Sequence, residues 1–320
     1  MIVALAGGVG GAKLAHGLYL ELETDALAIV ANTGDDFDLY GLRICPDSDT
    51  VLYTLSGIAN PETGWGIAGD TFESLDMLGR FGEEIWFRVG DRDLATDVLR
   101  THRLRAGWPL TRVMSSMATA LGVRARLLPM CDTPVATVVV TPAGERAFQE
   151  YFVRHHHAED VLGVRFVGIE EATVTNDVRD ALTAADGIVF CPSNPVVSIG
   201  PILGVPGMRD LIRDARVPVV AVSPIVGGKA LRGPADRMLT GLGVESSAYG
   251  VASLYRDVLT GFVIDQEDAG LAGRIQGLGV RVLTTDTVMR TVADRQRLAR
   301  EVLQFMRDGQ RANRAGGELV

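Results

Sequence analysis

Closely spaced aspartates form two acidic segments near the start of the chain. Asp35 and Asp36 lie in residues 32–38, and Asp47 and Asp49 lie in residues 45–50. Carboxylates this close repel one another unless a cation or hydrogen-bond donors balance them. Mg²⁺ prefers carboxylates together with substrate phosphate oxygens, so Asp47 and Asp49 are candidate metal ligands. The alternatives are a solvated turn for the first segment and a capped helix start for the second.

A glycine-rich turn at residues 7–11 is the second feature whose residues could bind a ligand. Glycines let a phosphate approach the backbone, and a helix start adds free N–H groups and the positive end of its dipole. Gly8, Gly10, Gly11 and Lys13 are therefore candidates for binding a nucleotide diphosphate. Lys13 is not followed by Ser or Thr, as in a P-loop, and it replaces the third glycine of a dinucleotide fingerprint. A tight turn that binds nothing is the alternative.

Two more polar turns follow apolar runs at residues 187–191 and 217–222. They carry side chains and backbone groups that suit a phosphate or a base, together with a second Gly-Gly pair followed by lysine. The candidate nucleotide-binding residues in these turns are Ser193, Asn194, Ser198, Gly227, Gly228 and Lys229. A role as linkers is possible for each turn alone, but the repetition at strand ends favours a shared ligand.

The apolar runs that precede these turns predict the fold. Residues 2–6, 26–31, 187–191 and 217–222 are apolar without alternation, which is typical of parallel strands buried on both faces. We therefore expect a Rossmann-like three-layer α/β/α fold with a mainly parallel sheet. In such sheets, ligands bind beyond the carboxyl ends of the strands.

We expect one domain spanning residues 1–320. Part of the chain does not follow the alternation of strands and helices that a parallel sheet requires, which predicts an insertion. A small α+β region of helices and a hairpin is expected at about 60–165, the hairpin joining residues 135–141 to 146–154. Residues 85–91 are expected to form a short strand that carries Arg88 into a turn. An arginine beside aromatic residues suits a flat polar ring or a phosphate, although a surface charge is also possible.

Composition limits the class of protein. The net charge of −9 argues against non-specific binding to nucleic acid. The 3 cysteines are dispersed, which suits a reducing cytoplasm, and no apolar run approaches the ~20 residues of a membrane span. We expect a cytoplasmic protein without a signal peptide, acting on small molecules. No Ser-His-Asp set or reactive cysteine stands out, so positioning and charge neutralisation, as in phosphoryl transfer, fit best.

Several motifs in order resemble the CofD family, the 2-phospho-L-lactate transferases of deazaflavin coenzyme (F-420) biosynthesis. The similarity runs from residue 1 to about 306, through LAGGVGGAKLAHGL, VANTGDDFDLYGLRICPDSDTVLYTL, WFRVGDRDLATDVLR, CPSNPVVSIGPIL and SPIVGGKALRGPA. The resemblance implies transfer of a phospho-acyl unit from a guanosine-diphosphate-activated acid to the ribityl hydroxyl of the deazaflavin Fo. GMP leaves, Mg²⁺ is required, and a homodimer is expected.

The resemblance also implies roles for individual residues. Asn32, Asp35 and Asp36 would line the reaction centre, and an aspartate among Asp35, Asp36 and Asp49 would accept the proton. Asn32, Asp49 and Arg88 match positions expected to contact Fo. The glycine turn and Lys13 would hold the diphosphate, while the later polar turns would hold the remaining guanosine nucleotide. The transferred acid stays open between phospholactate, phosphoenolpyruvate and phosphoglycerate types.

Two other classes of function compete with this interpretation. A nucleotide-sugar-binding regulator of the YvcK type would share the glycine-rich start and the fold, but residues 45–50 and 86–91 follow the transferase pattern. An NAD-dependent dehydrogenase is disfavoured, because the third fingerprint glycine is missing.

Overall fold

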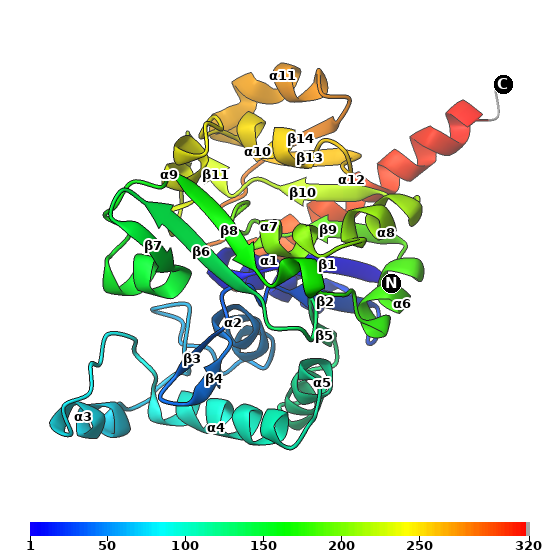
Figure 1. The fold of residues 1–320 in the computed structure, drawn as a ribbon. Helices are drawn as coiled ribbons and strands as arrows, with labels where there is room; N and C mark the ends of the chain where they lie inside the picture. Colours follow the sequence, from blue (N-terminus) through cyan, green and yellow to red (C-terminus); the bar gives the residue numbers. More distant parts are fainter. Residues whose placement is uncertain (318–320) are drawn as a thin grey trace.

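A seven-stranded parallel sheet forms the centre of the computed structural model, which describes residues 1–317 (Figure 1). Its strands, in spatial order, are β14 (Arg281–Thr285), β13 (Gly261–Asp265), β10 (Val219–Val222), β9 (Gly187–Phe190), β1 (Ile2–Ala6), β2 (Leu27–Ala31) and β5 (Arg126–Pro129). Every residue of β2, β9, β10 and β13 is buried. The prediction of strands covered on both faces is confirmed.

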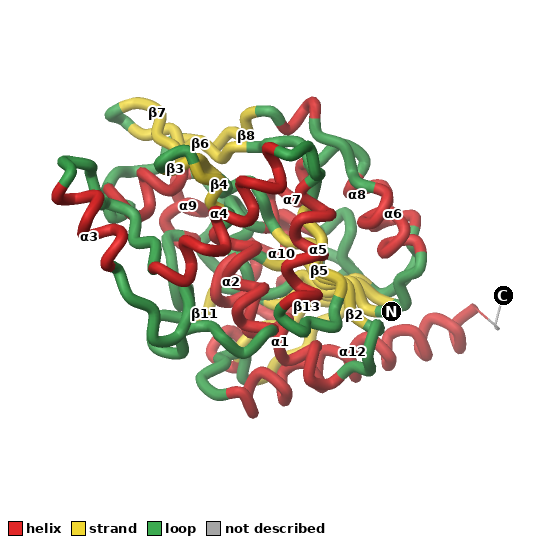
Figure 2. The backbone as a smooth tube through the Cα atoms, turned by 90° about the horizontal axis from the view of Figure 1, so that it is seen from below, coloured by secondary structure: helices red, strands yellow, loops and turns green. Residues whose placement is uncertain are grey.

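Helices cover both faces of this sheet. Ala4 and Ala6 face a core shared with one helical layer, and Val3 and Leu5 face the other. The first layer contains α1 (Gly8–Glu21), α2 (Pro46–Leu55), α5 (Leu110–Ala120) and α12 (Val292–Gly317), with α1 and α12 side by side (Figure 2). The second contains α6 (Asn176–Thr183), α7 (Ile199–Gly204), α8 (Met208–Asp214), α9 (Ala235–Gly241) and α10 (Ala248–Tyr255). The three-layer α/β/α prediction is confirmed.

The order of the strands locates the crevice where a ligand would bind. From β1 the chain proceeds to β2 and β5 on one side, then starts again at β9 and continues to β10, β13 and β14 on the other. Ligands of open parallel sheets bind at the carboxyl edge where this order reverses, which is here between β1 and β9. The carboxyl ends point left in Figure 1, towards α2 and β6. The polar turns that follow β1, β2, β9 and β10 therefore converge.

The expected insertion at 60–165 is not continuous, because β5 belongs to the main sheet. Two short strands, β3 (Phe37–Leu39) and β4 (Leu42–Ile44), precede this region, and between residue 60 and β5 the chain forms three helices, α3 (Glu73–Arg80), α4 (Asp91–Arg105) and α5. After β5, β6 (Ala136–Thr141) pairs antiparallel with both β7 (Gly144–Ala147) and β8 (Gly163–Val167). The predicted hairpin exists, but its second strand is shorter than expected, since Glu150–Arg154 form a π-helix.

The remaining short elements are β11 (Ile225–Val226), β12 (Lys229–Ala230), α11 (Ala272–Gln276) and two 3₁₀ turns, Ile169–Glu171 and Gln266–Leu271. The strand predicted at residues 85–91 is wrong, because this segment makes no strand pairing and is anchored by aromatic side chains instead. Among the described residues, no helix combines the length and the apolar character needed to cross a bilayer.

Candidate active site

Asp47 lies at the centre of the carboxyl edge and joins three of the converging turns. Its Oδ2 accepts a hydrogen bond of 2.9 Å from Asn32 after β2, and Ser198 Oγ after β9 lies 3.4 Å away. Burial raises the pKa of Asp47 to about 6, against hydrogen bonds from Asn32, the Gly8 backbone N–H and Ser198. Pro46 at the first turn of α2 starts the helix that places this carboxylate over α1.

Asn32 is fully buried, and its side-chain amide is used by the protein. Its Nδ2 donates to Asp47 and to the Val197 carbonyl (3.1 Å), and its Oδ1 accepts from the Gly34 N–H (2.9 Å). Both Nδ2 hydrogens are therefore used within the protein, and the predicted contact of Asn32 with Fo stays a prediction. Asn32 holds the strand end and Asp47 together.

The glycine turn approaches protein atoms very closely. A Cβ added at Gly7 would lie 2.4 Å from Asp47 Oδ2, one at Gly10 2.4 Å from the Pro192 carbonyl oxygen, and one at Gly11 2.3 Å from Ser193 Oγ. Gly8 has φ +62° and opens the helix in a left-handed conformation. Close packing against the first turn of α2 and against the turn after β9 therefore requires these glycines, and the Asp47 carboxylate lies at the start of α1.

Replacing Gly10 by alanine is therefore expected to lower the free energy of unfolding by about 1–3 kcal/mol, as overpacking against rigid backbone does. Gly273 provides the control, because a Cβ there meets nothing within 4 Å. Gly273→Ala should leave stability unchanged or raise it slightly. Urea denaturation of both variants tests this, and wild-type stability of Gly10→Ala would mean that the close approach at Pro192 is relieved easily.

The turn after β9 is organised by its own side chains. Ser193 Oγ accepts a hydrogen bond of 3.0 Å from the Gly7 N–H, and Asn194 Oδ1 accepts from the backbone N–H groups of Val196 (2.9 Å) and Val197 (3.3 Å). These contacts fix the loop that forms one wall of the crevice. Ser193 and Ser198 are both buried in the structure. Their predicted contact with a nucleotide stays a prediction.

Asp49 forms an ion pair with Arg100, an arginine that sequence patterns alone do not distinguish from its neighbours. Arg100 of α4 is fully buried, pairs with Asp49 and with Asp97 (2.7 Å), and donates to the Arg43 carbonyl (3.0 Å). Burial raises the pKa of Asp49 to about 7, opposed chiefly by Arg100. In sequence, Arg100 is one of several arginines on an amphipathic helix, so only the fold distinguishes it.

Asp35 and Asp36 complete the acidic cluster between Asp47 and Asp49. Asp35 is buried with one carboxylate oxygen that has no hydrogen-bond partner, and burial with repulsion from Asp47 and Asp36 raises its pKa well above the ordinary range. The Asp36 side chain is fully enclosed, 3.9 Å from Arg43, and burial raises its pKa to about 7. Asp36 therefore lies behind the surface that a substrate would touch.

This cluster predicts an unusual dependence of stability on pH. An aspartate in an unfolded chain has a pKa of about 3.9, whereas burial and repulsion from Asp49 raise the pKa of Asp97 to about 8. Between these values the folded state holds a proton that the unfolded state has lost, so stability is fully present below pH ~4 and falls as the pH rises towards 8.

Each such group contributes up to about 1.4 kcal/mol per pH unit within that window. Denaturation of the ligand-free protein from pH 5 to 8 should therefore show falling stability, with a shallower slope in Asp97→Asn. A stability that rises over this range would show that the aspartates stay charged at low cost.

The chemistry of the cluster fits a hard cation, although the geometry is not that of a finished metal site. The unpartnered oxygen of Asp35 and the carboxylate of Asp47 repel each other and would both bind Mg²⁺ favourably. Asp49 points to Arg100, so the structure does not bring Asp47 and Asp49 together as one ligand pair. Within the described residues, no three His, Cys, Asp or Glu side chains form a ready metal-binding group.

Arg88 lies apart from the aspartates, on the exposed segment between α3 and α4. Its guanidinium stacks 4.1 Å from the centroid of the Phe72 ring. Next to it, the rings of Phe37, Trp86 and Phe87 pack edge to face or tilted, at centroid distances of 4.9 to 5.9 Å. A partly exposed aromatic surface with an adjacent cation suits a flat polar ring, so the predicted role of Arg88 stays open to test.

The second Gly-Gly pair forms a tight hairpin. Gly227 and Gly228 have φ of +57° and +78° and connect β11 to β12. The Gly227 N–H donates to Asp268 beyond β13 (3.2 Å), and Lys229 is exposed. The tip of this hairpin therefore contacts the segment after β13, and the predicted contact of Gly227, Gly228 and Lys229 with a nucleotide stays a prediction.

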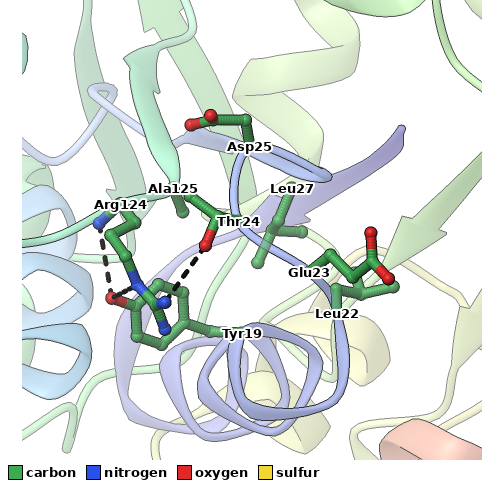
Figure 3. A pocket seen from close by; sticks show the side chains of 8 residues that line it. All are labelled: Tyr19, Leu22, Glu23, Thr24, Asp25, Leu27, Arg124 and Ala125. Atoms are coloured by element: carbon green, nitrogen blue, oxygen red, sulfur yellow. Dashed lines mark hydrogen bonds between the residues drawn. The ribbon is translucent and has the colours of Figure 1, made fainter.

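A hollow elsewhere on the surface does not compete as an active site. Tyr19, Thr24 and Arg124 line it near the starts of β2 and β5, at the opposite edge of the sheet (Figure 3). Arg124 Nη1 donates to Thr24 Oγ1 (3.1 Å), and its backbone and side-chain N–H groups reach the Tyr19 hydroxyl. The hollow is therefore filled by its own hydrogen bonds.

Comparison with known proteins agrees with the geometry of the carboxyl edge. A phosphoenolpyruvate transferase of Streptomyces griseus subsp. griseus is 43% identical over 310 residues, covering 95% of this chain and 98% of that protein. A 2-phospho-L-lactate transferase of Methanosarcina acetivorans is 39% identical, covering 94% and 98%. A UPF0052-family protein of Bacillus halodurans shares the fold, with TM-score 0.63, 15% identity, and 94% and 98% coverage. The family model described as 2-phospho-L-lactate transferase CofD matches residues 2–272, and the chain belongs to the CofD family of transferases.

Proposed function

We propose that this enzyme transfers a phospho-acyl unit from a guanosine-diphosphate-activated acid to the ribityl hydroxyl of Fo, in F-420 biosynthesis. The observation that carries the proposal is the buried aspartate cluster at the carboxyl edge, in a chain with extensive identity to transferases of this type. Such a cluster suits a reaction that must hold a cation and accept a proton beside a diphosphate.

The hydroxyl oxygen of Fo attacks the phosphorus that carries the acid, and a new P–O bond forms. The bond between this phosphorus and the bridging diphosphate oxygen breaks, and GMP leaves with the electron pair. The Asp49 side chain is buried but keeps 8% of its surface exposed, and its pKa near 7 suits a group that accepts the hydroxyl proton at neutral pH. Arg100 fixes its orientation.

Mg²⁺ would be held by Asp47, with Asp35 facing it, and by oxygens of the donor diphosphate. When bound, it supplies charge neutralisation at the phosphates. Asn32 and Ser198 orient the Asp47 carboxylate, and the rigid turn after β9 limits its movement. The protein thereby brings two anionic reactants together over an edge that is itself acidic.

Phosphoenolpyruvate is the acid that we propose for the donor. The relatives named phosphoenolpyruvate transferase from Streptomyces share 43–44% identity with this chain, against 36–39% for relatives named 2-phospho-L-lactate transferase. The two acids differ only in the bond between C2 and C3, which is double in phosphoenolpyruvate and single in phospholactate, so a small difference in the pocket suffices for the choice.

The competing function is a nucleotide-sugar-binding regulator of the YvcK type, which the shared fold alone would allow. Calorimetric titration with Fo, in the presence of GDP and Mg²⁺, separates the two. Saturable one-to-one binding of Fo supports the transferase. Absence of Fo binding together with tight binding of a UDP-sugar would replace the transferase with the regulator.

A further inference from the structure

The surface between α1 and α12 gathers positive charge beside the acidic cluster. Lys13 of α1 and Arg295 of α12 are half-buried, and Arg232 follows the hairpin β11–β12. Among residues 1–311, whose side chains the structure describes, none of these three cations forms an ion pair with a carboxylate. Arg232 is exposed and donates to the Thr63 carbonyl, whereas Lys13 and Arg295 keep partly buried charge without a carboxylate partner. Such charge is costly, and a bound anion would stabilise it.

Contacts place the three cations along one stripe of α1. A Cβ added at Gly64 would lie 2.7 Å from Val9 Cγ1 and 3.2 Å from Arg232 Nη1, which fixes Arg232 beside the first turn of the helix. One turn further on, Lys13 Nζ donates to the Met289 carbonyl (2.9 Å). Burial, then repulsion from Arg295 and Arg232, lowers the pKa of Lys13, so the three charges interact.

Arg295 has a buried hydrogen-bond donor that no group among the described residues uses. Its Nη1 lies 3.3 Å from His16 Nδ1, and its Nε is buried without a partner. Burial and Arg295 lower the pKa of His16 to about 4, so His16 is neutral at pH 7 and accepts this hydrogen bond. The nearby Asp294 accepts from the backbone N–H groups of Arg290 and Thr291 at the start of α12, and its charge partly opposes the lowering of the Lys13 pKa. Among the described side chains it forms no ion pair with Lys13 or Arg295.

We infer that Lys13, Arg232 and Arg295 form a phosphate-binding site between α1 and α12, which takes the diphosphate of the activated donor. The inference rests on the proposed function for the identity of that donor. It shifts the diphosphate from the backbone of the Gly8 turn, which Asp47 already approaches, towards the side chains of Arg232 and Lys13 along the first turns of α1. The basic stripe would hold the diphosphate, and Asp49 would face the acceptor.

Calorimetric binding of GDP and of inorganic pyrophosphate to the full chain tests this site. Arg295→Met and Arg232→Met should each weaken both affinities roughly 10- to 100-fold, as loss of a charge-assisted hydrogen bond does. Arg300→Met is the matched control, because Arg300 lies on the same helix but pairs with Glu21 (3.5 Å). It should leave both affinities within about twofold of the wild type, since exposed pairs contribute little.

The outcomes separate this site from the proposed function. If the wild type binds GDP and both variants bind it equally well, the basic stripe is not the site, while the guanine-nucleotide donor stands. If pyrophosphate binds and the variants weaken it, but GDP does not bind, the site stands and the guanosine donor is overturned. If the wild type binds neither probe, the phosphate site is overturned.

Discussion

Replacing Asp49 by asparagine should reduce the turnover of phospho-acyl transfer to Fo by about 10²–10⁴-fold, the loss expected when a general base is removed. The affinity for guanine nucleotide should be unchanged, because Asp49 faces Arg100 and the acceptor side of the edge. Steady-state kinetics with Fo as the varied substrate, together with calorimetry of GDP, measures both quantities.

Asp97→Asn is the control for this prediction, because Asp97 pairs with the same arginine but lies on α4 behind Asp49. A loss of less than about tenfold is expected there, since only the position of the base is disturbed. Equal losses in the two variants would show that Asp49 acts through the Arg100 network and not on the substrate. Wild-type turnover by Asp49→Asn would remove it from the mechanism.

Replacing Arg100 by methionine is the change with the largest expected effect on stability. It leaves Asp49 and Asp97 buried without their cation, and breaking a buried ion pair in this way costs about 3–5 kcal/mol. The loss should be larger at pH 8 than at pH 5.5, because both carboxylates can take up a proton at the lower pH.

Urea denaturation of Arg100→Met at the two pH values tests this prediction. Arg105→Met is the control, since Arg105 lies on the same helix and its exposed side chain donates to the Gly41 carbonyl. Its effect should stay within about 0.5 kcal/mol, as is usual for surface substitutions. An Arg100→Met protein as stable as the control would show that water or structural relaxation compensates the buried carboxylates.

The fold and the place of the site could be predicted from the sequence because both depend on local patterns. Buried apolar runs such as residues 2–6 identify parallel strands, and the polar turn after each run must lie at the carboxyl edge. The turn after residues 26–31 identifies Asp35 in this way, whereas the close spacing of carboxylates identifies Asp47 and Asp49. The structure places Asp35 and Asp47 beside the turn after β2, with Asp47 also contacting the turns after β1 and β9.

The interactions within the site could not be predicted, because they depend on packing between distant segments. Gly10 has the sequence pattern of a phosphate turn, yet its neighbour is the Pro192 carbonyl. Asn32 has an amide that could contact a substrate, but its Nδ2 donates hydrogen bonds to Asp47 and to the Val197 carbonyl. Arg100 and Arg295 lie on helices far along the chain, and only the tertiary structure makes one the partner of Asp49 and leaves the other without an anion.

The most direct test of the transferase assignment is mass spectrometry of the reaction product. The purified protein is incubated with Fo, Mg²⁺ and equal amounts of guanosine-diphosphate-activated phosphoenolpyruvate and phospholactate. We predict GMP and an Fo phosphodiester that carries mainly the phosphoenolpyruvate-derived acid. A product carrying mainly lactate would overturn the donor assignment alone. Unchanged Fo, with no GMP released from either donor, would contradict the transferase function.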